Sequence, residues 1–237
     1  MMKNFFELSR SFFCNLLDLF YPRLCVACGH ILQKNEEHLC LRCLLHLPES
    51  NYHSSDENPL LAIFLGRVRV ESVNSYLLFR KGNYVQSILH QLKYKGNKEI
   101  GAYLGKRYAT IMMDAGIWQD VDVIIPIPLH PQKMRSRGYN QSEWIAKGLS
   151  EGSGIPYRND CLIRATFTET QTKKSRFNRW ENVKNVFAVT NEYLLEGKHV
   201  LLCDDVLTTG ATLEAAIQKL LLVPGVRVSV VTLAAAK

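Results

Sequence analysis

Residues 199–212 read HVLLCDDVLTTGAT, and this stretch decides the fold of the chain. It begins with a short apolar run, HVLLC (199–203), that is predicted to be a strand, passes through two acids and ends in a Thr-Thr-Gly-x-Thr turn. The sequence after the turn repeats apolar residues at helical spacing on one face: Leu213, Ala216, Ile217, Leu220 and Leu221. The run RVSVVTLA (227–234) then has the composition of a strand. A strand, a helix and a strand in this order predict a βαβ unit and therefore a parallel sheet.

The preceding sequence predicts more elements of the same kind. VNSYLLF (73–79) is predicted to be a strand, and VDVIIPIP (121–128) a buried parallel strand that prolines end. Helices are predicted over 99–113 and 141–150, and a further helix has its inner face at Val85, Ile88, Leu89 and Leu92. These elements predict an α/β fold. The basic segment 164–184 has no clear period, which indicates a long functional loop or hairpin that could act as a lid.

The turn between strand and helix has the chemistry of a sugar-phosphate site. Backbone N–H groups at a helix N-terminus bind anions, and threonine hydroxyls add donors while Gly210 lets the backbone come close. Asp204 and Asp205 would repel a phosphate, but they can accept hydrogen bonds from vicinal sugar hydroxyls or hold Mg²⁺ through water. A phosphorylated sugar satisfies both halves of the motif.

Four of the seven cysteines form two Cys-x-x-Cys pairs with eleven residues between them: Cys25, Cys28, Cys40 and Cys43. Each pair can direct two thiolates at one tetrahedral centre, and a segment too short for its own core needs a metal to fold. A structural zinc ribbon is therefore predicted, with redox dithiols as the rival interpretation. Cys14, Cys161 and Cys203 are expected to be reduced thiols.

The apolar positions of the N-terminus repeat at spacings of three and four, which predicts an amphipathic helix in residues 1–22. We expect it to pack on its own protein rather than on a membrane surface, because its polar face has few cations. No stretch predicts a stable membrane span, and a cytoplasmic location is expected. The expected domains are this helix, the zinc ribbon (23–48) and a main domain (60–237), with a polar linker over 50–60.

The formal net charge is +7, and the surplus of cations lies beyond residue 60. A basic main domain favours a polyanionic ligand, and a phosphorylated sugar, a nucleic acid or an anionic lipid fits equally well. Lys93 and Lys95 stand at a predicted helix end, where cations are favoured in any case, and a role as ligands is the alternative interpretation.

The run VLLCDDVLTTGAT (200–212) closely resembles the thirteen-residue signature that binds phosphoribosyl pyrophosphate (PRPP) in type I phosphoribosyltransferases. The resemblance implies that fold, a Rossmann-like parallel sheet flanked by helices, and it implies Mg²⁺ as the ion bound with PRPP. It makes Asp204 and Asp205 the catalytic pair that holds the ribose hydroxyls. The residues that would wrap the 5-phosphate are Thr208, Thr209, Gly210, Ala211 and Thr212.

Two further runs, IPIPLHPQKMRSRGYNQSEWIA (125–146) and ETQTKKSRFNRWENVKNVF (169–187), together with the cysteine pairs, resemble the ComF family. That family, which includes GntX-like proteins, places a zinc ribbon before a phosphoribosyltransferase domain and is associated with DNA uptake in natural competence. The resemblance implies a set of pyrophosphate and lid residues: Leu129, His130, Arg137, Asn140, Gln141, Gln171 and Arg179.

Three functions remain open from the sequence. The first is Mg²⁺-dependent phosphoribosyl transfer from PRPP to an unidentified base or amine, or PRPP binding alone. The second is a non-catalytic role in DNA uptake, in which the protein binds single-stranded DNA and works with the uptake machinery. The third is a regulator that senses PRPP. Salt distinguishes the DNA-binding function, because DNA binding weakens steeply as salt rises while PRPP binding needs Mg²⁺ and the acidic pair. A regulator would bind its ligand without releasing pyrophosphate.

Overall fold

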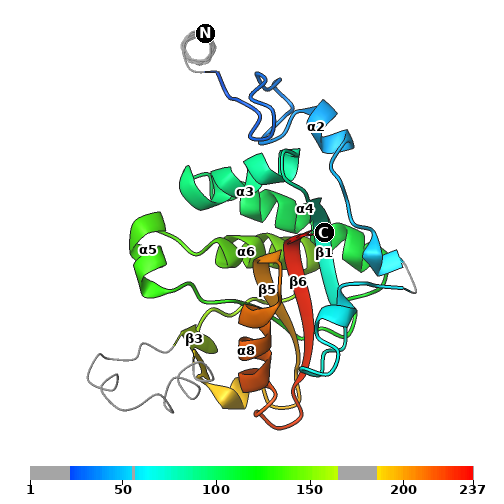
Figure 1. Ribbon diagram of the computed structural model, residues 1–237, viewed down its shortest axis with the longest axis vertical. Helices are drawn as coiled ribbons and strands as arrows, with labels where there is room; N and C mark the ends of the chain where they lie inside the picture. The colour runs from blue at the N-terminus through cyan, green and yellow to red at the C-terminus, as the bar shows by residue number, and fades with distance from the viewer. Residues whose placement is uncertain (1–21, 55–56, 165–185, 237) are drawn as a thin grey trace, which may run out of the picture. The chain divides into compact units, whose positions relative to one another are not determined.

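A four-stranded parallel sheet with the order β1-β6-β5-β2 organises residues 48–237. The computed structural model describes residues 22–54, 57–164 and 186–236 and divides the chain into two compact units, 1–47 and 48–237. Figure 1 shows the sheet strands side by side. Their bounds are Val73–Phe79 (β1), Val123–Pro126 (β2), His199–Leu207 (β5) and Arg227–Ala236 (β6).

Helices cover both faces of this sheet. Helix α8 (Ala211–Leu220) packs with Val200 and Leu202 in one apolar cluster, so it covers the face to which these side chains point. The other face meets helix α6 (Gln141–Ser153), where Cys203 Sγ lies 3.7 Å from the carbonyl oxygen of Ser142. Alternate side chains of a strand point to opposite faces, which explains why β5 is apolar along most of its length. The predicted α/β fold is confirmed.

The helices that precede and flank β2 bring their ends to the same edge of the sheet. Helix α3 (Tyr84–Tyr94) buries the four predicted residues of its inner face, and helix α4 (Glu99–Asp114) packs against α6. Helices α4 and α6 can approach closely because Gly148 has no side chain. A Cβ at this position would lie 1.9 Å from the carbonyl oxygen of Ala102. A short helix, α5 (Pro131–Arg137), follows β2.

Strands β3 (Leu162–Arg164) and β4 (Phe187–Val189) pair antiparallel and form a separate ribbon. They flank the segment that the sequence predicts to be a lid, and residues 165–185 lie outside the described residues. Arg164 ends β3 and pairs in register with Phe187. The ribbon therefore fixes the position of Arg164.

The structure differs from two sequence-based expectations near β5. The strand does not end at Cys203 but continues through the acidic pair to Leu207, because β6 pairs with it as far as Ala235. Asp204 and Asp205 are thus strand residues rather than turn residues. Leu221, predicted on the buried face of α8, is half-buried and follows the last helical residue.

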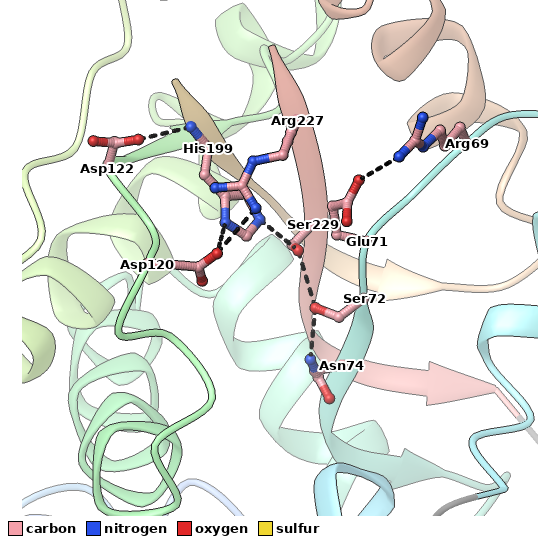
Figure 2. Close-up of polar contacts among 9 residues, drawn as sticks. All are labelled: Arg69, Glu71, Ser72, Asn74, Asp120, Asp122, His199, Arg227 and Ser229. Carbon is pink, nitrogen blue, oxygen red and sulfur yellow. Dashed lines mark hydrogen bonds and ion pairs between the residues drawn. The ribbon is translucent and has the colours of Figure 1, made fainter. Parts of the chain in front are cut away.

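A buried polar network ties together the N-terminal ends of the strands (Figure 2). His199 Nε2 lies 2.8 Å from Ser229 Oγ, which accepts a hydrogen bond from Ser72 Oγ at 3.0 Å. Asn74 Nδ2 donates to Ser72 Oγ at 3.3 Å, while His199 Nδ1 lies 3.1 Å from Asp120 Oδ2, outside hydrogen-bond geometry. The network gives partners to polar groups that the sheet buries.

Within the described part of the chain, no helix combines the length and the apolar composition that crossing a membrane requires.

Candidate functional site

A cavity of about 520 Å³ lies at the C-terminal end of β5. Parallel strands place their C-terminal ends at one edge, and the crevice there is the usual ligand site of an open α/β sheet. Its wall comes from elements far apart in the sequence, including α3, the segment after β2, the start of α6, the end of β3 and the start of α8. Seven residues predicted from the sequence line it: Leu129, Arg137, Gln141, Asp204, Asp205, Thr208 and Thr212.

The acidic pair is held by neighbours on both sides. Asp204 Oδ1 accepts hydrogen bonds from Ser142 Oγ at 2.9 Å and from the backbone N–H of Asp205 at 2.8 Å. Asp205 Oδ1 lies 3.1 Å from Lys93 Nζ. Each carboxylate therefore has a fixed orientation before any ligand binds.

Burial raises the pKa of Asp204 to about 7, and the charge of Asp205 adds to the effect. The bonds from the Asp205 N–H and from Ser142 oppose it. Asp204 is half-buried, and one side of it lines the cavity. Asp204 thus changes charge near neutral pH.

The loop that follows the pair is held by contacts on its outer side. Gly210 has φ of 74°, and a Cβ there would lie 2.9 Å from Ile63 Cγ2, so another residue would be both strained and crowded. Arg67 Nη1 donates to the carbonyl oxygens of Ile63 and Thr209, each at 2.9 Å, and Arg67 also pairs with Glu214. The glycine is therefore required by the turn itself and by packing on Ile63.

The second candidate site is the four-cysteine cluster, in which all four Sγ atoms lie within 4.8 Å of one another. Cys28 Sγ and Cys40 Sγ are 3.7 Å apart, close to the roughly 3.8 Å that a tetrahedral Zn–S distance near 2.3 Å requires. Burial opposes ionisation of Cys25, but backbone N–H groups, that of Cys40 first among them, outweigh it and lower the pKa to about 7. The donor set fits a tetrahedral metal ion.

Comparison with known proteins bears on both sites. A family model described as "Phosphoribosyl transferase domain" matches residues 140–237. The "Competence protein F" of Haemophilus influenzae is 29% identical over 85% of this chain and 92% of its own length. The "Competence protein ComFC" of Bacillus subtilis is 26% identical over 84% of this chain and 78% of its own length.

Over most of its length the chain is similar to competence proteins of the ComF type. It combines the Cys₄ metal-binding cluster with a phosphoribosyltransferase domain, as the sequence predicts. The "DNA utilization protein YhgH" of Escherichia coli O157:H7 is 34% identical over 56% of this chain, and the match spans 60% of that relative.

Several residues carried over from the ComF resemblance lie elsewhere than on the cavity wall. His130 caps α5, where its Nδ1 accepts from the Gln132 N–H at 3.2 Å. Asn140 is buried, caps α6 through the Ser142 N–H at 3.2 Å and donates to the Ile127 carbonyl oxygen at 2.9 Å. Three residues carried over from the PRPP signature are also absent from the wall: Thr209 and Gly210 precede α8, and Ala211 is its first residue. Gln171 and Arg179 lie outside the described residues.

Several cations that line the cavity were not predicted as site residues from the sequence. Lys133 and Arg164 line it, as does Lys93, which the sequence marked only as a helix-end cation. Burial lowers the pKa of Arg164, an effect that the Asp204 charge opposes, and its guanidinium lies 5.3 Å from the Phe187 ring centre. Lysine and arginine are mostly solvated surface residues, so their sequence context carried no distinguishing signal.

Proposed function

We propose that this ComF-like chain binds PRPP together with Mg²⁺ in the cavity and transfers its phosphoribosyl group to a base or an amine. One observation carries the proposal: paired carboxylates lie near the C-terminal end of a parallel strand, a few residues before the next helix, and both line one cavity with four cations. The cations are Lys93, Lys133, Arg137 and Arg164.

The chain's own groups suit each part of PRPP. The free carboxylate lone pairs of Asp204 and Asp205 can accept hydrogen bonds from the ribose hydroxyls. The amides and hydroxyls at the start of α8 suit the 5-phosphate, which the helix dipole also favours. Arg137, which donates to Gln141 Oε1 at 2.8 Å, is oriented to stabilise charge on departing pyrophosphate.

Catalysis at such a site would come mainly from orientation and electrostatics. The C1–O bond to pyrophosphate breaks and its electron pair leaves with pyrophosphate, while the acceptor nitrogen forms the new bond to C1 and releases its proton to pyrophosphate or water. When bound with the substrate, Mg²⁺ would supply positive charge that neutralises the diphosphate oxygens. The identity of the acceptor decides which product is formed.

Titration calorimetry of the full chain with PRPP in Mg²⁺ tests the binding step. We expect micromolar binding that Asp205→Asn weakens by at least tenfold, because the amide replaces a charged acceptor of ribose hydroxyls. Glu196→Gln, which removes an exposed carboxylate, is the matched control and should bind as the unaltered chain does. Unchanged affinity for PRPP in Asp205→Asn would show that the acidic pair does not bind the ribose hydroxyls.

A screen of bases and amines for pyrophosphate release tests the transfer step. Release that depends on both PRPP and one acceptor supports the enzyme. Tight PRPP binding without release for any acceptor favours the PRPP-sensing regulator instead.

The Cys₄ cluster is proposed to hold a structural zinc ion, since four protein thiolates leave no open coordination position. We expect one zinc per chain by elemental analysis, and loss of that zinc in Cys43→Ser because the buried thiolate is replaced. Amide exchange in residues 22–47 should then rise steeply. A Cys43→Ser chain that retains zinc and protection would contradict the ligand assignment.

A second candidate function is binding of single-stranded DNA, which a surface feature favours. The centre of the Trp144 ring lies 4.7 Å from Lys98 Nζ and 4.6 Å from Lys147 Nζ. An aromatic residue on helix α3, Tyr94, is 64% exposed. Bases stack on such rings while lysines contact phosphates. Trp144→Ala should weaken oligonucleotide binding about tenfold at low salt and leave PRPP binding unchanged. Equal DNA affinity in the variant and the unaltered chain would exclude this surface as a DNA-binding site.

A further inference from the structure

An ion pair crosses the cavity wall between two of its lining residues. Lys93, in the last turn of α3, places Nζ 3.1 Å from Asp205 Oδ1. The two side chains are only 22% and 16% exposed, so both charges are largely withdrawn from water. Among the described cations of the wall, Lys93 is the one that forms an ion pair with the acidic pair.

We infer that Lys93 makes the cavity selective for a ribose phosphate that carries pyrophosphate at C1 over the same sugar phosphate without it. The inference rests on the proposed function, because it assumes that Asp205 receives ribose hydroxyls. It assigns the recognition of pyrophosphate to a residue that no motif marks.

The first step of the argument is an exchange of partners at Asp205. Ribose hydroxyls that donate to this carboxylate compete with the ammonium group for its lone pairs. A buried charge that loses its partner is costly, so Lys93 must find another anion as the sugar binds. Pyrophosphate on C1 supplies that anion beside the same ribose ring, whereas ribose 5-phosphate supplies none.

The second step concerns the two arginines of the wall, Arg137 and Arg164, which already have fixed neighbours. The Arg137 guanidinium lies 5.1 Å from the Tyr94 ring centre and donates to Gln141 Oε1 at 2.8 Å. Arg164 lies over the Phe187 ring. These two arginines add to the positive potential, but neither forms an ion pair with Asp205. Only Lys93 therefore couples sugar binding to pyrophosphate binding among the described residues.

The third step is the chemistry of the side chain. An ammonium has three donors on a flexible stem, so it can turn from Asp205 toward a pyrophosphate oxygen or bridge the two. Methionine keeps a similar unbranched stem and removes the charge. Lys93→Met consequently isolates the charge from the packing of α3.

The test compares two ligands on the full chain in Mg²⁺, PRPP and ribose 5-phosphate, by titration calorimetry. Lys93→Met is expected to weaken PRPP binding by about 10- to 100-fold, the value of a charge-assisted hydrogen bond to a diphosphate. Ribose 5-phosphate should bind the variant as tightly as the unaltered chain or more tightly, since Asp205 no longer has a competing partner. The preference for PRPP therefore shrinks.

Lys95→Met is the matched control, because it removes a lysine from the same helix end at an exposed position outside the cavity wall. It should leave both affinities within about twofold. Equal weakening of both ligands in Lys93→Met would overturn the inference, since it would mean that Lys93 only orients Asp205. An unaltered chain that binds neither ligand would instead reject the proposed function itself.

Discussion

The two ends of strand β5 both have acid and base groups beside them, yet they use them differently. At the N-terminal end, Asp122 Oδ2 accepts from the His199 N–H at 2.8 Å and Asp122 Oδ1 lies 3.1 Å from Lys198 Nζ. At the C-terminal end, Asp204 and Asp205 keep lone pairs directed toward a cavity. Polar groups that the protein satisfies itself stabilise the fold, whereas groups that face a cavity are available to a ligand.

The carboxylate pKa values show the same contrast. The backbone N–H of His199 and the nearby Lys198 lower the pKa of Asp122, although burial opposes the shift. Burial instead raises the pKa of Asp204 to about 7. The folded protein thus favours the charged form at one end of the sheet and disfavours it at the other, which is expected where function costs stability.

The largest expected effect is on the structural end. His199→Ala should lower the free energy of unfolding by about 3 kcal/mol, because it removes the partner of the buried Ser229 hydroxyl and leaves a cavity. Chemical denaturation measures this loss. PRPP affinity of the folded fraction should not change, and a variant that keeps full stability but loses PRPP binding would break the comparison between the two ends.

The acidic pair should show an effect of opposite sign. Asp204→Asn is expected to raise stability at pH 8 by about 2 kcal/mol, because the folded chain no longer holds a confined carboxylate ionised. A raised pKa destabilises the fold only where the acid is ionised, so the gain should vanish as pH falls from about 7 toward 4. Thermal melting across this range checks it, and a gain that does not depend on pH would contradict the cause.

The smallest effect is expected at Asp122. Because its pKa is lowered in the fold, its contribution is present above the unfolded pKa near 4 and is lost as pH falls through the lower folded value. Asp122→Asn should therefore cost less than about 1 kcal/mol at pH 7, given that its side chain is 37% exposed and screened by solvent. Melting of the variant and the unaltered chain should converge in acid, and a gap that widens there would refute the assignment.

Much of the fold could be predicted because its signals are local. The strand over 73–79 and the helical face from Val85 to Leu92 follow from periods of two and 3.6 residues, and the structure has both. The Cys₄ cluster also follows from spacing, since two short turns bring their thiolates together. The end of β5 could not be placed this way, because pairing with β6 extends it through charged residues.

The residues of the cavity also fall into those that the sequence could predict and those that it could not. Asp204, Asp205, Thr208 and Thr212 could be predicted because one strand, one turn and one helix carry them in a continuous motif. Lys93 and Ser142 reach Asp205 and Asp204 across 112 and 62 residues, and Arg67 reaches Thr209 across 142. No local period relates residues so far apart.

The amino-acid sequence alone determined the kinds of element, the four clustered cysteines and the acidic pair with the turn that follows it, because neighbours along the chain specify these features. Only the tertiary structure decided which cation meets Asp205, which hydroxyl orients Asp204 and which end of the sheet keeps an open cavity. The physical reason is that burial, and the electrostatic strength it gives to a charge, depends on segments that meet only when the sheet forms.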